Sequence, residues 1–167
     1  TDYKATNTPA KRDLLRPLVD AFRARGIRIG LYYSLIDWHH PHFVIDRHVG
    51  PYREHADLAA LNQGRDMRIY AKYMRDQVTE LLTNYGDIDI LWFDFSYPKP
   101  DGSGKGRADC ESDALYALVR KLAPKVIMDD RLDMGDEGWD IKTPEQFQPR
   151  CCNQAVACSA PAVCPRP

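Results

Sequence analysis

The chain alternates between amphipathic helical patterns and short apolar runs, and this alternation constrains its fold more than any other feature. Apolar residues recur at helical spacing in three segments, residues 9–25, 66–84 and 110–122. A short run typical of a β-strand follows each of them, at residues 27–36, 88–94 and 125–130. Strands that alternate with helices predict a parallel sheet with helical crossovers. We therefore expect an α/β fold, and the pattern fits part of a TIM-like (β/α)8 barrel, with three or four of its eight units.

The same periodicities predict which side chains face the core. In the first helix the expected apolar face comprises Leu14, Leu15, Leu18, Val19 and Phe22. In the second helix the residues expected to point inward are Ile69, Tyr73, Val78, Leu81 and Leu82. In the first strand Ile27, Ile29 and Leu31 share one face.

Composition indicates an ordinary globular domain. The 167 residues are 44% hydrophobic and 28% charged, with a formal net charge of −1. This balance gives no reason to expect nucleic acid or an anionic membrane as a partner, and no apolar stretch approaches the roughly 18 residues of a membrane span. The first residues do not resemble a signal peptide. Because the chain starts at Thr1 without an initiator Met, we expect it to be a piece of a longer protein.

The last 17 residues differ in composition from the rest of the chain. They are rich in Pro and Ala, and they hold four of the five cysteines, Cys151, Cys152, Cys158 and Cys164. The cysteine spacing matches no zinc pattern. We expect residues 151–167 to be disordered or not native coding sequence, and residues 1–150 to form a partial catalytic barrel domain.

Each predicted strand ends in polar or aromatic residues. These ends read Tyr32-Tyr33-Ser34, Trp92-Phe93-Asp94 and Asp129-Asp130-Arg131. Because the C-terminal ends of parallel strands meet at one edge of the sheet, we expect the functional site there. Asp94 is the most informative residue, since a carboxylate at the end of a buried strand is costly unless it is paired or used.

Trp92 lies two residues before Asp94 and therefore faces the same side of the strand. An aromatic plane beneath a carboxylate can hold the apolar face of a sugar while the acid reaches its anomeric carbon. Arg131 would stabilise the charged carboxylate, and its planar fork can bind a sugar hydroxyl. The alternative is purely structural, with Asp94 capping the following loop or pairing with Arg131.

A long polar loop at residues 37–64 begins with the sequence "DWHHPHF". His39 and His40 could bind a divalent metal together with Asp94. Adjacent histidines on a loop rarely converge on one ion, so we expect no metal site here. We expect instead that Trp38 and His39 form a pocket wall that supplies stacking and hydrogen bonds.

The segment "GSGKG" at residues 102–106 resembles a phosphate-binding loop only superficially. It lacks the Walker spacing, and we interpret it as a solvated turn. No glycine fingerprint follows any predicted strand, which disfavours dinucleotide binding.

In order along the chain, the segments "GLYYSLIDWHHPHF", "YGDIDILWFDF", "DDR" and "KTPEQF" resemble the α-L-fucosidases of glycoside hydrolase family 29. The resemblance covers about residues 1–149, and the "LWFD" strand is its most specific element. It implies a (β/α)8 barrel enzyme that requires no metal or organic cofactor. It also implies a secreted or periplasmic location.

The resemblance further implies roles for single residues. Asp94 corresponds to the catalytic nucleophile, and Trp92 to a residue that lines the fucose pocket. Tyr32, with Tyr33 as the alternative, and Arg131 correspond to residues that contact the sugar.

Two positions do not follow the family pattern directly: the acid/base at Glu145 is one of two alternatives, and Phe95 departs from the pattern. Glu145 of "KTPEQF" corresponds to the acid/base of some members, whereas others use a Glu after a Trp slightly further on, and this chain has no Glu after Glu145. Phe95 stands where the family commonly has Gly, and we expect its bulk to narrow the side of the site that receives the leaving group.

The implied function is that of a retaining exo-glycosidase. It would hydrolyse terminal α-L-fucose from fucosylated oligosaccharides or glycoconjugates through a covalent glycosyl-enzyme intermediate. Two alternatives stay open. One is a metal-dependent barrel hydrolase that uses Asp94 with His39 and His40, and the other is an inactive fragment of a fucosidase.

Overall fold

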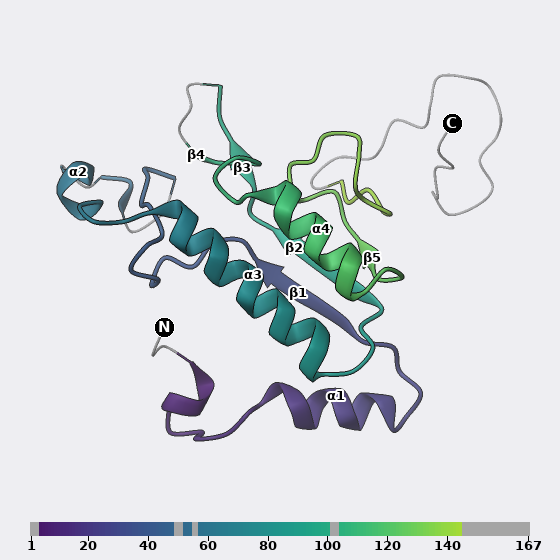
Figure 1. Cartoon of the computed structure of the whole chain (residues 1–167). Coiled ribbons are helices and arrows are strands. Elements are labelled where there is room, and N and C mark those ends of the chain that lie inside the picture. Colours follow the sequence, from purple (N-terminus) through teal and green to yellow (C-terminus); the bar gives the residue numbers. More distant parts are fainter. Residues whose placement is uncertain (1–3, 49–51, 55–56, 101–103, 145–167) are drawn as a thin grey trace, which may run out of the picture.

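The computed structural model describes residues 4–48, 52–54, 57–100 and 104–144 (Figure 1). Four α-helices, one short 3-10 helix and five strands occupy these ranges. The helical elements are η1 (Ala5–Asn7), α1 (Leu15–Arg23), α2 (Leu58–Leu61), α3 (Met67–Asn84) and α4 (Ser112–Leu122). The strands are β1 (Gly30–Ser34), β2 (Ile90–Asp94), β3 (Tyr97–Pro98), β4 (Gly104–Lys105) and β5 (Ile127–Met128).

Strands β1, β2 and β5 form a parallel sheet in that order. The register pairs Tyr32 with Trp92 and Ser34 with Asp94, so the ends of β1 and β2 lie level. Helix α3 connects β1 to β2 and helix α4 connects β2 to β5, which is the crossover pattern that the sequence predicts. The predicted α/β class with parallel strands is thus confirmed.

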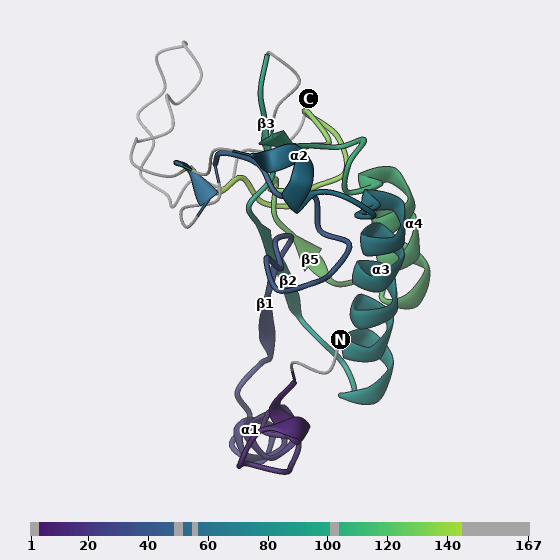
Figure 2. The same ribbon diagram turned by 90° about the vertical axis from the view of Figure 1, so that its left-hand side faces the viewer.

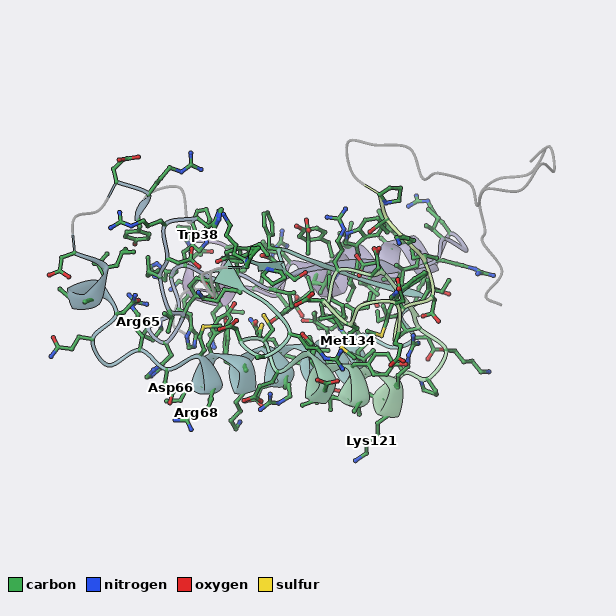
Figure 3. The ribbon with its side chains drawn as sticks, turned by 90° about the horizontal axis from the view of Figure 1, so that it is seen from above. Trp38, Arg65, Asp66, Arg68, Lys121 and Met134 are labelled. Carbon is green, nitrogen blue, oxygen red and sulfur yellow. The ribbon has the colours of Figure 1, made fainter. Side chains whose placement is uncertain are left out.

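Helices α3 and α4 cover one face of this sheet (Figures 1 and 2). The core fills the space between the two layers. Its fully buried side chains include Leu91, Phe93, Tyr70, Met74, Val78, Leu115 and Val119. Met134 also lies between the layers, whereas Lys121 points from α4 into solvent (Figure 3). In the part of the chain that the structure describes, no helix has the length and apolarity to cross a membrane.

Helix α1 lies beside one end of the sheet and is anchored mainly through its arginines (Figure 2). The Arg16 guanidinium donates to the carbonyl of Asn84, and Arg23 donates to those of Tyr85 and Asp87. Gly86, between the last two acceptors, has φ +73°, and a Cβ there would lie 2.8 Å from Arg23 Nη1. The positive φ therefore favours glycine at position 86, and a larger side chain would also displace the Arg23 guanidinium.

The predicted inner face of α1 is wrong at three of its five residues. Val19 is buried and Leu15 packs against the core, but Leu14, Leu18 and Phe22 are exposed. Ile69 on α3 is also 48% exposed, because Tyr70 and Met74 occupy the buried side of that helix. Periodicity locates an apolar stripe, but tertiary packing decides which part of the stripe is covered.

The interpretation of residues 102–106 as a solvated turn is also wrong where the structure describes them. Gly104 and Lys105 form β4, which pairs antiparallel with β3. Lys105 is only 5% exposed. Its ammonium group pairs with Asp46 Oδ2 at 2.8 Å and lies 5.7 Å from the centre of the Phe43 ring. The ion pair ties the β3–β4 hairpin to the long loop that follows β1.

Candidate active site

Asp94 is the last residue of β2 and lies on the side of the sheet that α3 and α4 do not cover. Side chains alternate along a strand, so Leu91 and Phe93 enter the core while Trp92 and Asp94 face the other way. On the neighbouring strand, Tyr32 has the same orientation because it is paired with Trp92. Strand pleating alone therefore brings these three polar or aromatic groups to one surface.

Three donors hold the Asp94 carboxylate. The Tyr32 hydroxyl donates to Oδ2 at 2.8 Å, the Arg131 Nη1 group donates to Oδ1 at 3.1 Å, and the backbone N–H of Phe95 donates to Oδ1 at 2.8 Å. The side chains of Asp94 and Arg131 are about three-quarters buried. Charge-assisted hydrogen bonds of this kind restrict the rotamer of the carboxylate as well as stabilising its charge.

Arg131 is itself oriented by the segment that follows β5. Its Nε donates to Thr143 Oγ1 and its Nη2 to the Thr143 carbonyl, both at 2.9 Å. The Thr143 hydroxyl in turn donates to Asp130 Oδ1 at 2.7 Å. Thr143 thus engages Nε and Nη2, and the remaining nitrogen, Nη1, is directed at Asp94.

A hollow of about 730 Å³ opens above this carboxylate. Four of the residues singled out from the sequence line it, namely Tyr32, Trp92, Asp94 and Arg131. Thr143 and Pro144 form part of its wall. A pyranose could lie against the Trp92 indole with one ring carbon facing Asp94, which is the geometry that attack on an anomeric carbon requires.

Trp38 and His39 do not line that hollow. They line a separate one of about 500 Å³, together with Asp37 and Phe95. The candidate acid/base Glu145 lies outside the described residues.

His40 packs in the helical layer, away from Asp94. Its ring is 6% exposed and contacts Tyr70 and Tyr73 of α3, with centroids 5.2 and 4.4 Å away. Its Nδ1 accepts the backbone N–H of His42 at 3.1 Å, and burial lowers the pKa of the imidazole. Among the described residues, no group of three or more His, Cys, Asp or Glu side chains could hold a metal ion. The metal-dependent alternative thus gains no support from this loop.

Asp129, which follows β5, hydrogen-bonds the backbone of Phe93, the residue before Asp94. It was not recognised from the sequence as a site residue. It is 1% exposed, and its Oδ1 accepts the backbone N–H of Phe93 at 3.0 Å. The carboxylate replaces the backbone acceptor that β5 would supply if the strand continued. No protein hydrogen bond reaches Oδ2. Burial raises the pKa of this carboxyl to about 6, although hydrogen bonds from Phe93 and Arg131 oppose the shift.

We expect Asp129→Asn to change how stability depends on pH. A carboxyl whose pKa rises on folding binds its proton more tightly in the folded state, so stability falls as pH rises from about 4 to about 6. The variant has no such proton. The free energy of unfolding of the variant minus that of the unchanged chain should therefore rise by up to about 3 kcal/mol from pH 4 to pH 7.

Urea unfolding at pH 4, 5, 6 and 7 checks this, with Asp20→Asn on the exposed side of α1 as the matched control. The amide oxygen at position 129 can still accept from the Phe93 N–H, so this hydrogen bond is retained. A change in the pH dependence of the free energy of unfolding therefore reports the missing carboxyl proton. Parallel pH profiles of the unchanged chain and Asp129→Asn would contradict a raised pKa.

Phe95, directly after Asp94, has φ +71°. A bulky residue in this left-handed region is an outlier that costs on the order of 1–2 kcal/mol. Glycine adopts the same conformation without strain, which gives a physical reason for the glycine that the resemblance associates with this position. Phe95 keeps its strained backbone although its side chain is 50% exposed and adds little to the core.

We expect Phe95→Gly to raise the free energy of unfolding by about 0.5–1 kcal/mol, since relief of strain outweighs the greater flexibility of the unfolded chain. Phe95→Ala removes the same ring but keeps Cβ, so it should bring no gain. Denaturant titration of both variants measures the difference, and equal stabilities would show that residue 95 is unstrained.

A carboxylate held beside an aromatic plane, at the C-terminal ends of parallel strands, is typical of the glycoside hydrolases that cleave sugars on α/β scaffolds. Comparison with known proteins identifies the family. The sequence model described as Alpha-L-fucosidase matches residues 1–157, so this chain belongs to the α-L-fucosidase family. The resemblance inferred from the sequence is confirmed.

Solved structures and curated relatives agree. The chain is similar to α-L-fucosidase isoenzyme 1 from Paenibacillus thiaminolyticus, with 45% identity and a TM-score of 0.74 over 90% of this chain. It is also similar to the α-L-fucosidase AlfC of Lactobacillus casei in complex with Fucα(1,6)GlcNAc, with 25% identity and a TM-score of 0.66 over 89% of this chain. Human tissue α-L-fucosidase is 33% identical over 100 residues, or 60% of this chain.

The chain is short relative to these proteins. It spans 36% of the Paenibacillus chain, 46% of the AlfC chain and 18% of the human protein.

Proposed function

We propose that this chain is part of the catalytic domain of a retaining exo-α-L-fucosidase that removes terminal α-L-fucose from glycans or glycoconjugates. The observation that carries the proposal is the Asp94 carboxylate, held by Tyr32 and Arg131 in a hollow that Trp92 also lines. The AlfC structure is in complex with a fucosylated sugar, which supports the same substrate class for this chain.

The architecture we propose is a segment of a (β/α)8 barrel, with residues 1–150 as the catalytic domain. Two features support it. Helices α3 and α4 lie on one face of the sheet, as in the outer ring of such a barrel. The candidate site also lies at the C-terminal ends of β1 and β2, where barrel enzymes have their active sites.

In the proposed mechanism, an Asp94 oxygen attacks the anomeric carbon of fucose from the side opposite the leaving group. The glycosidic C–O bond breaks as the new C–O bond forms, and a protonated carboxylic acid transfers its proton to the departing oxygen. The same group, now a carboxylate, takes a proton from water, which attacks the anomeric carbon and releases Asp94. Two inversions give net retention, and the reaction needs no cofactor.

Tyr32 and Arg131 have distinct proposed tasks. Their hydrogen bonds orient the Asp94 carboxylate before the substrate arrives, and both side chains can also donate to fucose hydroxyls. Trp92 would hold the apolar face of the sugar. Glu145 is the proposed acid/base, and it follows Pro144, which lines the hollow, directly in the sequence.

The test is hydrolysis of 4-nitrophenyl α-L-fucoside, with the first-formed anomer of fucose identified by proton NMR. This chain is compared with a chimera in which its residues 4–144 replace the matching segment of the Paenibacillus enzyme. We expect α-L-fucose to appear first. Initial release of the β-anomer would contradict the retaining mechanism, and an inactive chimera would contradict the proposed function. Loss of activity with a chelator would favour the metal-dependent alternative.

A further inference from the structure

Asp130 precedes Arg131 in the segment that follows β5, and the mechanism proposed above gives it no task. It does not line the hollow beside Trp92. Its Oδ1 atom nevertheless accepts two hydrogen bonds from Thr143, one from the backbone N–H at 3.0 Å and one from the hydroxyl at 2.7 Å. Hydrogen bonds to a carboxylate are charge-assisted, so this pair holds both the backbone and the side-chain rotamer of Thr143.

The segment that carries Thr143 returns alongside the end of β5. The carbonyl of Met128 accepts the backbone N–H groups of Asp140 and Ile141, at 2.8 and 3.2 Å. Asp130 adds a further anchor two residues later, at Thr143. The backbone of this segment is therefore held by β5 at Ile141 and by the Asp130 side chain at Thr143, where the segment forms part of the wall of that hollow.

The Thr143 hydroxyl links Asp130 to Arg131 in one direction only. Arg131 Nε can only donate, so the hydroxyl oxygen accepts from it, at 2.9 Å. The single hydroxyl proton is then directed at Asp130. Because Arg131 Nη2 also donates to the Thr143 carbonyl, two of the three guanidinium nitrogens are held by Thr143.

The third nitrogen of Arg131, Nη1, donates to Asp94 Oδ1 at 3.1 Å. An arginine side chain is long and flexible, and without its contacts to Thr143 it would sample rotamers that do not reach Asp94. A continuous series of hydrogen bonds thus runs from Asp130 through Thr143 and Arg131 to the Asp94 carboxylate.

The same segment leads to the proposed acid/base. Thr143 is followed by Pro144, which also lines the hollow, and then by Glu145. A retaining mechanism needs its nucleophile and its acid/base only about 5–5.5 Å apart. Asp130 therefore acts both on the segment that leads to Glu145 and on the guanidinium that contacts Asp94.

Resting on the function proposed above, we infer that Asp130 is a positioning residue of the fucoside site. Through Thr143 it keeps the Arg131 guanidinium aimed at Asp94 and at the hydroxyls of fucose, although it touches neither the sugar nor a reacting atom. Its loss should impair binding and chemistry together, because Arg131 serves both.

Steady-state hydrolysis of 4-nitrophenyl α-L-fucoside by the chimera described above tests this inference. We expect Asp130→Ala to lower kcat/KM by about 10- to 100-fold, with a rise in KM of at least about threefold. A misplaced guanidinium produces both changes, whereas a smaller folded fraction lowers the apparent kcat and leaves KM unchanged. Asp136→Ala, an exposed substitution later in the same loop, is the matched control and should change neither constant.

Thr143 offers a finer pair of variants, which decide the question even if Asp130→Ala does not fold. Thr143→Val keeps the shape of the side chain but lacks the hydroxyl, so it should lower kcat/KM and raise KM as Asp130→Ala does. Thr143→Ser keeps the hydroxyl and should restore most of that loss. A Thr143→Ser variant as impaired as Thr143→Val, or an Asp130→Ala variant with the kinetics of the control, would overturn the inference and leave the fucosidase function standing.

Solvent exchange of the Arg131 Nε–H proton, measured by NMR on the full chain, gives a readout that does not depend on activity. The signal is identified by its absence from Arg131→Lys. We expect exchange at least about tenfold faster in Asp130→Ala and in Thr143→Val, because local opening becomes easier when this acceptor is lost or released. Unchanged exchange in both variants would overturn the inference. With an inactive chimera, which would contradict the proposed function, faster exchange would still support Asp130 as the residue that positions Arg131.

Discussion

Asp94→Asn is expected to lower the rate of 4-nitrophenol release from 4-nitrophenyl α-L-fucoside by at least about a thousandfold, in whichever form of the protein turns over. The amide has nearly the shape of the carboxylate but no charge and little nucleophilicity. Its oxygen can still accept from Arg131, and its nitrogen can donate to the Tyr32 hydroxyl, so the surrounding hydrogen bonds are retained. The loss should therefore reflect chemistry rather than local unfolding.

A companion variant, Asp94→Ala, separates a nucleophile from a residue that only positions the substrate. Azide can occupy the space left by the carboxylate and attack the same face of the anomeric carbon. It should restore turnover and give β-L-fucosyl azide. Asp20→Asn, an exposed substitution on α1, should leave the rate unchanged. An Asp94→Ala variant that azide cannot rescue, or an active Asp94→Asn, would remove Asp94 from the role of nucleophile.

Lys105→Met is expected to lower the free energy of unfolding by about 3–5 kcal/mol, because it leaves a buried carboxylate without its partner. The side chains of Lys105 and Asp46 are 6% and 14% exposed. Tyr97 also donates to Asp46 Oδ2, at 3.0 Å. Burial alone would raise the pKa of Asp46, but the hydrogen bond and charge of Lys105 outweigh it and the pKa lies below its usual value.

Urea denaturation measures the effect, and Lys72→Met is the matched control. Lys72 pairs with Asp76 at 2.6 Å, but both side chains are more than half exposed, so its loss should cost less than about 1 kcal/mol. The double variant Lys105→Met with Asp46→Leu should recover most of the stability, since it removes both charges. A Lys105→Met variant as stable as Lys72→Met would show that the pair is hydrated rather than buried.

The candidate site was predictable to the extent that it follows from strand pleating and motif order. Asp94 and Trp92 share a face because they are two residues apart in β2, and the prediction that Tyr32 and Arg131 lie near them agrees with their hydrogen bonds to Asp94. Trp38 and His39 line a pocket in the structure, and it is distinct from the one that Trp92 lines. The roles of all these residues stay predictions.

Other features were beyond sequence reasoning because they depend on partners that are distant in the chain. The "GSGKG" segment has the composition of a solvated turn. Lys105 is nevertheless buried, and its ammonium group pairs with the carboxylate of Asp46, 59 residues earlier. Asp129 accepts a hydrogen bond from the N–H of Phe93, 36 residues earlier. It does so because β5 ends before its backbone could supply an acceptor for that N–H.

The sequence by itself determined the α/β class, the order of the three longer helices and of the strands of the parallel sheet, and the family, because hydrophobic periodicity and motif order can be read locally along the chain. Only the tertiary structure decided how much of the apolar stripe of α1 is covered, which ions are buried, and that Trp38 and Trp92 line different hollows. Those properties depend on how separate elements pack, and packing is set by contacts between residues that no local pattern relates.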